Sequence, residues 1–212
     1  MCRRFSNSGW LLAVGLSVGL SCAGQAFAAA TPMVMGPLYV EPKRDATHPA
    51  PADAAGCPVR IVDLSDPRRA PETIGSWVTF RALQAPADRM TWLRSVFEVG
   101  LAARGFKPSF GPPADSAAPS NAVSASIRLK AIWISTMQMN KVGSVAVQMS
   151  AAPSGAAPGP MKVYRGDESG LNWAGSTGEF NGLVNRVFAD AMDDMAQDLL
   201  PLCTAAAKVA NN

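Results

Sequence analysis

The residues of this chain that could do chemistry are first of all its four cysteines. Cys2 and Cys22 lie in the first thirty residues, whereas Cys57 and Cys203 lie at the two edges of the longest stretch of patterned sequence. In an oxidising compartment such a pair forms a disulfide, which here would close a loop of roughly 150 residues. We predict a disulfide between Cys57 and Cys203; the alternative is two buried free thiols.

Motifs for catalysis are not found in the sequence. Nucleophilic catalysis by serine or cysteine needs a histidine held beside the nucleophile, and the single histidine, His48, lies in an alanine- and proline-rich stretch. The chain contains no GxSxG, P-loop, dinucleotide-binding, HExxH or CxxC motif. We therefore expect no catalytic residue, no cofactor and no enzymatic activity.

A row of carboxylates is the next pattern. Asp190, Asp194 and Asp198 recur every fourth residue, which favours a solvated helix face with one ion pair to Arg186. A basic partner or a cation is the alternative occupant of the row. Asp198 projects nearest the apolar side of the predicted helix, so we expect it to have a structural hydrogen-bond partner.

Methionines form the last such pattern. Thioethers are suitable ligands for Cu(I). No histidine or free cysteine supports a copper site, so methionine filling gaps at a sheet edge is favoured, and weak periplasmic Cu(I) binding is the alternative. The residues concerned are the pairs Met33/Met35 and Met137/Met139, with Met149 and Met161 in predicted strands.

The N-terminus has the form of a bacterial export signal. Two arginines precede an apolar run over residues 10–20, which is too short to span a bilayer. The AFA sequence at 26–28 suits cleavage after residue 28, which predicts a periplasmic protein. The alternative is an outer-membrane lipoprotein that faces the periplasm and contacts the membrane through a lipidated Cys22, although Leu20 stands one place too close to that cysteine for a regular lipoprotein signal.

Composition divides the chain into four parts. Removal of the signal peptide, residues 1–28, leaves 17 basic and 16 acidic residues, a balance that lacks the basic footprint of nucleic-acid binding. Residues 29–56 are rich in alanine and proline and are expected to be a disordered tether. Residues 57–203 are expected to form an α+β envelope domain, followed by a disordered tail over 204–212.

Periodicity predicts the elements of the first half of the domain. Alternating apolar and polar residues predict a strand over 59–64 and shorter strands near 77–80 and 106–110. Asp88 suits a helix N-cap and Gly105 a helix C-terminus, with apolar residues three and four apart between them.

A long hairpin is predicted in the second half. The strongest alternation begins at Val123 and puts Ala131 and Trp133 on the core face of a strand. Its antiparallel partner follows a turn at 140–143, and a third strand begins at residue 161.

The last predicted element is the longest helix. Ser176 and Glu179 have capping-box spacing, and the apolar stripe that follows ends near Pro201. The order of elements indicates an α+β domain: an antiparallel or mixed sheet of four to five strands with two helices packed on one face.

Several segments together resemble the YajG-like lipoproteins of bacterial envelopes. They are VRIVDLSDPR from residue 59, ARGF from 103, IRLKAIWIS from 127, VYRG from 163 and NGLVNRVFADAMDDMAQDLL from 181. The auxiliary lipoproteins of ABC-type transporters have a similar layout and are the second family. The resemblance covers about residues 57–203 and implies an α+β envelope domain without a known active site; the displaced lipoprotein signal departs from the family pattern.

These features predict a non-enzymatic exported accessory protein that contacts another component of the cell envelope, a protein or a lipid. The alternative is a lipid- or small apolar ligand-binding module of a transport system, which requires an apolar groove between helices and sheet. An exposed tryptophan beside the sheet would mark a contact surface; the four that follow the signal segment are Trp77, Trp92, Trp133 and Trp173.

Overall fold

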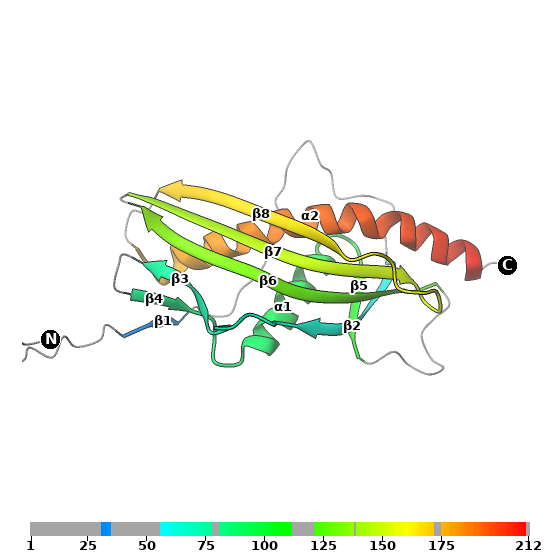
Figure 1. Ribbon diagram of the computed structural model, residues 1–212. Helices are drawn as coiled ribbons and strands as arrows, with labels where there is room; N and C mark the ends of the chain where they lie inside the picture. The colour runs from blue at the N-terminus through cyan, green and yellow to red at the C-terminus, as the bar shows by residue number, and fades with distance from the viewer. Residues whose placement is uncertain are drawn as a thin grey trace, which may run out of the picture.

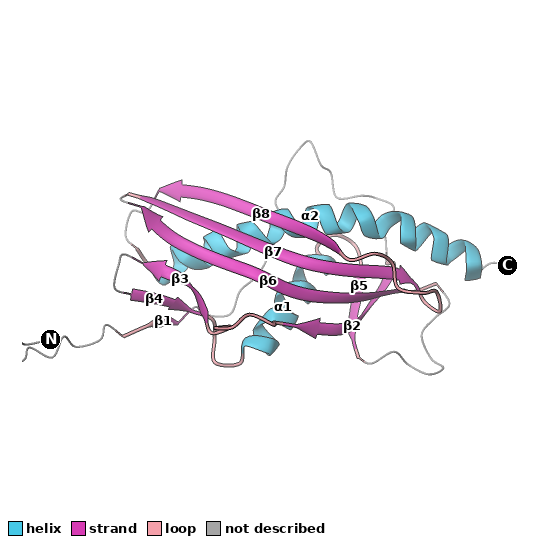
Figure 2. Ribbon diagram, viewed as in Figure 1, coloured by secondary structure: helices cyan, strands magenta, loops and turns pink. Residues whose placement is uncertain are grey.

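A computed structural model describes residues 31–34, 56–77, 81–111, 121–137, 139–171 and 175–210. In these residues, strands form one mixed sheet and two helices pack against one of its faces (Figures 1 and 2). The α+β prediction is confirmed, but the sheet has eight strands instead of four to five. The signal peptide with Cys22, the tether residue His48 and Trp173 lie outside the described residues.

The elements differ widely in length. The long strands are β2 (Pro58–Ser65), β6 (Val123–Met137), β7 (Asn140–Pro153) and β8 (Lys162–Leu171). The short strands are β1 (Met33–Val34), β3 (Thr73–Trp77), β4 (Arg81–Gln84) and β5 (Lys107–Phe110). The helices are α1 (Arg89–Ala102) and α2 (Thr177–Ala210).

Strand β6 organises the sheet. Along one side it pairs antiparallel with β7, which in turn pairs antiparallel with β8. Along its other side it pairs in parallel with β2 over its first part and with β3 near its end. β5 continues the sheet beyond β2, and β4 and β1 continue it beyond β3.

The underestimated strand count comes from the short strands. A strand of two to five residues is too short to show a period-two pattern in the sequence. Such a segment becomes a strand because it pairs with a neighbouring strand. β1 lies in the predicted tether and pairs with β4 through Met33 and Leu83. β3 begins at Thr73, earlier than the strand predicted near 77–80, and residues 78–80 of that prediction lie outside the described residues.

A β-bulge reverses the side of β6 that is buried, so the prediction for the second half of this strand is wrong. Ala131 and Trp133 were expected on the core side, but the pairing with β7 shifts between Leu129 and Ala131. The extra residue, Lys130, reverses the alternation because successive strand residues point to opposite faces. Beyond it Ile132 and Ile134 are buried, whereas Trp133 is 51% exposed.

The helix starts follow the sequence predictions. The Asp88 carboxylate accepts a hydrogen bond from the Thr91 backbone N–H at 3.1 Å, which confirms the N-cap of α1. At the start of α2, the Ser176 and Glu179 side chains each accept from the other residue's backbone N–H, which confirms the capping box. Gly105, which follows α1, has a φ of +86°, as a glycine at a helix C-terminus commonly has.

The end of α2 differs from the prediction. The helix was expected to stop near Pro201 and to be followed by a disordered tail, but it continues to Ala210 with the proline inside it. Proline removes one backbone hydrogen bond, and tertiary contacts outweigh this loss here: Cys203 is disulfide-bonded to Cys57, just before β2, and Ala206 is fully buried.

The core lies between the sheet and the two helices. It is one cluster of buried apolar side chains from nearly every element. Phe188 of α2 stands at its centre, with edge-on ring contacts to Trp92 and Phe97 of α1 at 6.0 and 6.2 Å. Such aromatic pairs contribute beyond their buried area, and here they join the two helices.

Gly166 of β8 lets α2 approach the sheet closely. A Cβ atom at this position would lie 1.8 Å from the Val187 carbonyl oxygen, so backbone meets backbone. We expect Gly166→Ala to push the helix off the strand and to lower the free energy of unfolding by about 3 kcal/mol, the upper part of the range for overpacking. Urea unfolding followed by circular dichroism measures this loss.

Gly170 is the matched control on the same strand. A Cβ atom there would contact only the ends of the Lys141 and Arg186 side chains, at 3.6 and 4.0 Å. Gly170→Ala should leave stability unchanged or raise it slightly, because alanine is less costly than glycine within a strand. Equal stability of the two variants would contradict the close backbone contact at Gly166.

Candidate functional site

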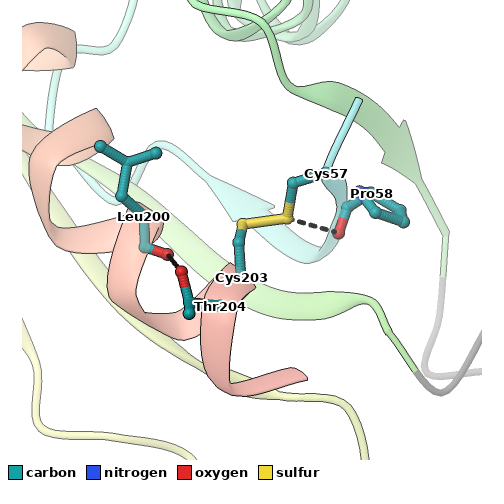
Figure 3. The surroundings of a disulfide bond; sticks show 5 residues. All are labelled: Cys57, Pro58, Leu200, Cys203 and Thr204. Atoms are coloured by element: carbon teal, nitrogen blue, oxygen red, sulfur yellow. Dashed lines mark hydrogen bonds between the residues drawn. A yellow bond between two sulfur atoms is a disulfide. The ribbon is translucent and has the colours of Figure 1, made fainter. Parts of the chain in front are cut away.

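The two cysteines that follow the signal segment form a disulfide that closes the domain. Cys57 immediately precedes β2 and Cys203 lies in the C-terminal part of α2, with their Cα atoms 6.0 Å apart (Figure 3). The bond joins residues 146 positions apart. It therefore ties the entry of the first long strand to the last helix, which is a structural role.

The face of β6, β7 and β8 that points away from the helices carries exposed apolar side chains, among them Trp133 and Val163. Within the described part of the chain no helix or strand covers it (Figure 2). Trp133 of β6 lies opposite Ser144 of β7, which lies opposite Asp167 of β8. We call this side of the three strands the open face.

A shallow pocket of about 440 Å³ lies on the open face. Ser144 is small, so the row leaves a hollow between the Trp133 indole and the Asp167 carboxylate, whose strands are two spacings apart, roughly 10 Å. The pocket is lined by Trp133, Val142, Gly143, Ser144, Asp167, Glu168 and Ser169. An aromatic face and a carboxylate at this separation suit a cationic side chain that lies between them.

A second pocket of about 480 Å³ lies between β2, the start of α1 and the end of β5. Its lining combines the apolar residues Ile61, Leu64, Met90 and Phe110 with the polar residues Asp63, Thr91 and Arg94. The Arg94 guanidinium stands over the Phe110 ring, 4.9 Å from the ring centroid. This groove between a helix and the sheet is therefore lined by both a cation, Arg94, and an anion, Asp63.

Asp198 has the structural partner that its position predicted. Its carboxylate accepts hydrogen bonds from the Tyr164 hydroxyl at 2.7 Å and from the Lys162 ammonium at 3.0 Å. The Tyr164 hydrogen bond is the main reason that the pKa of Asp198 lies below its usual value. Burial, followed by the Asp198 hydrogen bond, raises the pKa of Tyr164 well above 10.

The raised pKa of Tyr164 predicts a loss of stability at alkaline pH. The unfolded chain releases the phenolic proton at about pH 10, whereas the folded chain retains it, so stability falls as pH rises above that value. Tyr164→Phe should flatten this fall between about pH 10 and 11. Thermal unfolding of both proteins from pH 8 to 11 measures it, and parallel curves would contradict the prediction.

Arg104 is a buried charge that sequence reasoning missed. Its side chain is 3% exposed and pairs with Asp193 of α2, with Nε and Oδ1 2.8 Å apart. It also donates to the backbone carbonyls of Gly100 and Ala189, each at 2.8 Å. The carbonyl at the Ala189 position belongs to the middle of α2, so one guanidinium joins the end of α1 to that helix.

The methionines of the copper hypothesis are spread over the sheet. Met149 is buried in the core, whereas Met139 at the hairpin turn is 63% exposed. Ten strand positions at about 3.3 Å each put the two roughly 30 Å apart. Met161 lies near Met149, just before β8, and Met35 is outside the described residues. The buried Met149 fills the core.

The described residues contain no cluster of three or more histidine, cysteine, aspartate or glutamate side chains that would hold a metal ion. None of their helices combines the length and apolar character needed to cross a membrane.

No protein-family model matches the chain, and no curated protein matches it either. Solved structures with similar chains include an uncharacterised protein, with a TM-score of 0.42 and 8% identity over 68% of this chain and 93% of that one.

Two bacterial lipoproteins are also among these structures. The lipoprotein GNA1162 from Neisseria meningitidis has a TM-score of 0.31 and 9% identity over 61% of this chain and 94% of its own. A minor lipoprotein from Acinetobacter baumannii has a TM-score of 0.29 and 10% identity over 68% of this chain and 93% of its own.

Proposed function

We propose that this chain is a non-enzymatic, exported accessory protein of the bacterial envelope, related to the YajG-like lipoproteins, that acts by contacting another envelope component through the open face. The observation that carries the proposal is Trp133, half exposed at the wall of the pocket on that face. Large exposed aromatics on an uncovered surface are typical of contact sites.

The chemistry of the pocket specifies the partner further. Asp167 stands across from the indole, and Val142 adds apolar area on the neighbouring strand. A protein segment with a lysine or arginine flanked by apolar side chains would place its cation over Trp133 and beside the carboxylate. The export signal and the disulfide support an oxidising compartment for this contact.

A site-specific crosslink tests the proposal. A photoreactive amino acid at Ser144, in the floor of the pocket, should crosslink to a component of the envelope in living cells. Trp133→Ala should reduce the crosslink about 30-fold, the loss that truncation of a central aromatic commonly produces. Val209→Ala is the control, because Val209 is 67% exposed on α2, away from the pocket.

Two results would overturn the proposal. One is a crosslink that Trp133→Ala and Val209→Ala reduce equally, which would show that the pocket is not the contact site. The other is turnover of a defined substrate by the purified protein, which would replace the accessory role with an enzymatic one.

The pocket between β2 and α1 favours a second candidate function, binding of a small apolar ligand or lipid in a transport system. The apolar part of its lining and the cation of Arg94 suit an aliphatic chain with an acidic head group. A dansyl-labelled fatty acid should gain fluorescence on binding. Arg94→Glu should abolish this gain, whereas Arg89→Glu, exposed at the start of the same helix, should not.

A further inference from the structure

The outer edge of β8 is the least protected edge of the sheet. Natural proteins usually protect edge strands by making them short, irregular or proline-containing, or by placing charges on them, and β8 uses only the last of these. At other edges the sheet ends in β5, which has four residues including Pro108, and in β1, which has two. β8 has ten residues and no proline, and it pairs with β7 over ten consecutive residue pairs without a register shift.

The free edge of β8 offers regular backbone donors and acceptors. Within the described residues β8 pairs with β7 alone, and its opposite edge carries no strand (Figure 1). Apolar side chains at both of its ends are exposed, with Val163 at 51% and Leu171 at 52%. An extended strand added to this edge would continue the ladder.

The charges on β8 determine which strand can pair with its free edge. On the open face the strand presents a cation at Arg165 and an anion at Asp167, one on each side of Gly166. This arrangement repels most strands but is complementary to itself when it is reversed. Opposite charges directly across an antiparallel pair stabilise it, and like charges destabilise it.

The register of a symmetric pairing follows from these two residues. A two-fold axis perpendicular to the sheet keeps both open faces on the same side. With the axis at Arg165 or at Asp167, that residue lies opposite itself and like charges meet. With the axis at Gly166, Arg165 lies opposite Asp167 of the second copy, and the symmetry forms this pair twice.

We propose that two copies of this chain associate through antiparallel pairing of their β8 strands, centred on Gly166, to form one continuous sheet. This register aligns nine of the ten β8 residues, Lys162 to Gly170, with the same nine of the second copy. The surface is isologous, so the assembly closes as a dimer and does not extend further.

The helix beneath β8 fits the same symmetry. Gly166 lies against Val187 and Ala191 of α2, so the axis passes beside this part of the helix. Arg186, which pairs with Glu168 of β8 in its own chain, precedes this level along the helix and Asp194 follows it, and both are exposed. The reversed second copy therefore brings Asp194 toward Arg186, which gives a second complementary pair.

Charge reversal at the axis tests the pairing. Sedimentation velocity of the protein, expressed from its full-length sequence and purified in its processed form, should show a dimer in wild type. Arg165→Asp should put carboxylates opposite each other at both symmetric positions and raise the dimer dissociation constant at least about tenfold. Asp167→Arg should have the same effect, and the double variant should restore the wild-type constant.

The combined pattern distinguishes this interface from others. Arg165 does not line the pocket on the open face, so loss of the dimer in Arg165→Asp is separable from loss of the envelope contact. A monomer at every concentration in wild type would overturn the proposal. So would a dimer that all three variants leave unchanged, or one that the double variant fails to restore while circular dichroism shows it folded.

Discussion

Cys203→Ser is expected to lower the free energy of unfolding by up to about 5 kcal/mol, because the bond to Cys57 closes a loop of 146 residues. The unfolded chain then regains the conformations that the crosslink removes. For a chain of this size the loss corresponds to a decrease in Tm of roughly 10 to 20 °C. Differential scanning calorimetry measures it.

Three comparisons isolate the contribution of the disulfide to the Tm. Cys57→Ser should have the same Tm as Cys203→Ser, and the double variant should equal either single variant, because each removes the same bond. Reductant should lower the Tm of wild type toward that of the variants and should leave the variants unchanged. If reductant and both substitutions leave the Tm of wild type unaltered, the bond is absent from the folded protein.

Arg104→Met is expected to lower the free energy of unfolding by about 4 kcal/mol. The apolar replacement fills much of the volume, but it leaves the buried Gly100 carbonyl near the end of α1 without its guanidinium donor and Asp193 without its cation. Unpaired buried polar groups retain their full desolvation cost. Chemical denaturation of both proteins, fitted with one common m-value, measures the loss in unfolding free energy.

Arg128→Met is the matched control for burial. Arg128 pairs with Asp63 at 3.9 Å, and both side chains are 48% exposed. Exposed ion pairs contribute little because water screens them, so this variant should remain within about 0.5 kcal/mol of wild type. Comparable losses in the free energy of unfolding at positions 104 and 128 would show that burial does not determine how much these ion pairs contribute to stability.

The bulge in β6 shows where sequence reasoning failed. The apolar and polar alternation ends at Lys130, because the next four residues, 131–134, are all apolar, and their pattern alone does not show which side of the strand is buried. The register shift is set by the pairing with β7, and it moves the indole from the core to the open face. The residue on which the proposed function depends was therefore predicted on the wrong side of the sheet.

The sequence-based expectations for Arg104 and for the segment that forms β1 were wrong for a related reason. The arginine stands after a predicted helix, where a solvent-exposed side chain is the ordinary expectation. Its burial depends on Asp193, 89 residues away, and on the docking of α1 against α2. β1 lies in a segment whose composition indicates disorder, and it becomes a strand through pairing with β4.

By itself the sequence determined the local elements of this protein: both helix caps, the long hairpin, the mixed α+β character and the hydrogen-bonded role of Asp198. The caps and the hairpin depend mainly on neighbours within a few residues, where steric and hydrogen-bonding rules act directly. For Asp198 the sequence indicated only that a partner exists, and the partner itself, Tyr164, lies 34 residues away. The tertiary structure decided the number of strands, the exposure of Trp133, the burial of Arg104, the length of α2 and the free edge of β8. Each of these depends on which distant segment lies alongside, and loop closure and packing over the whole chain determine that choice.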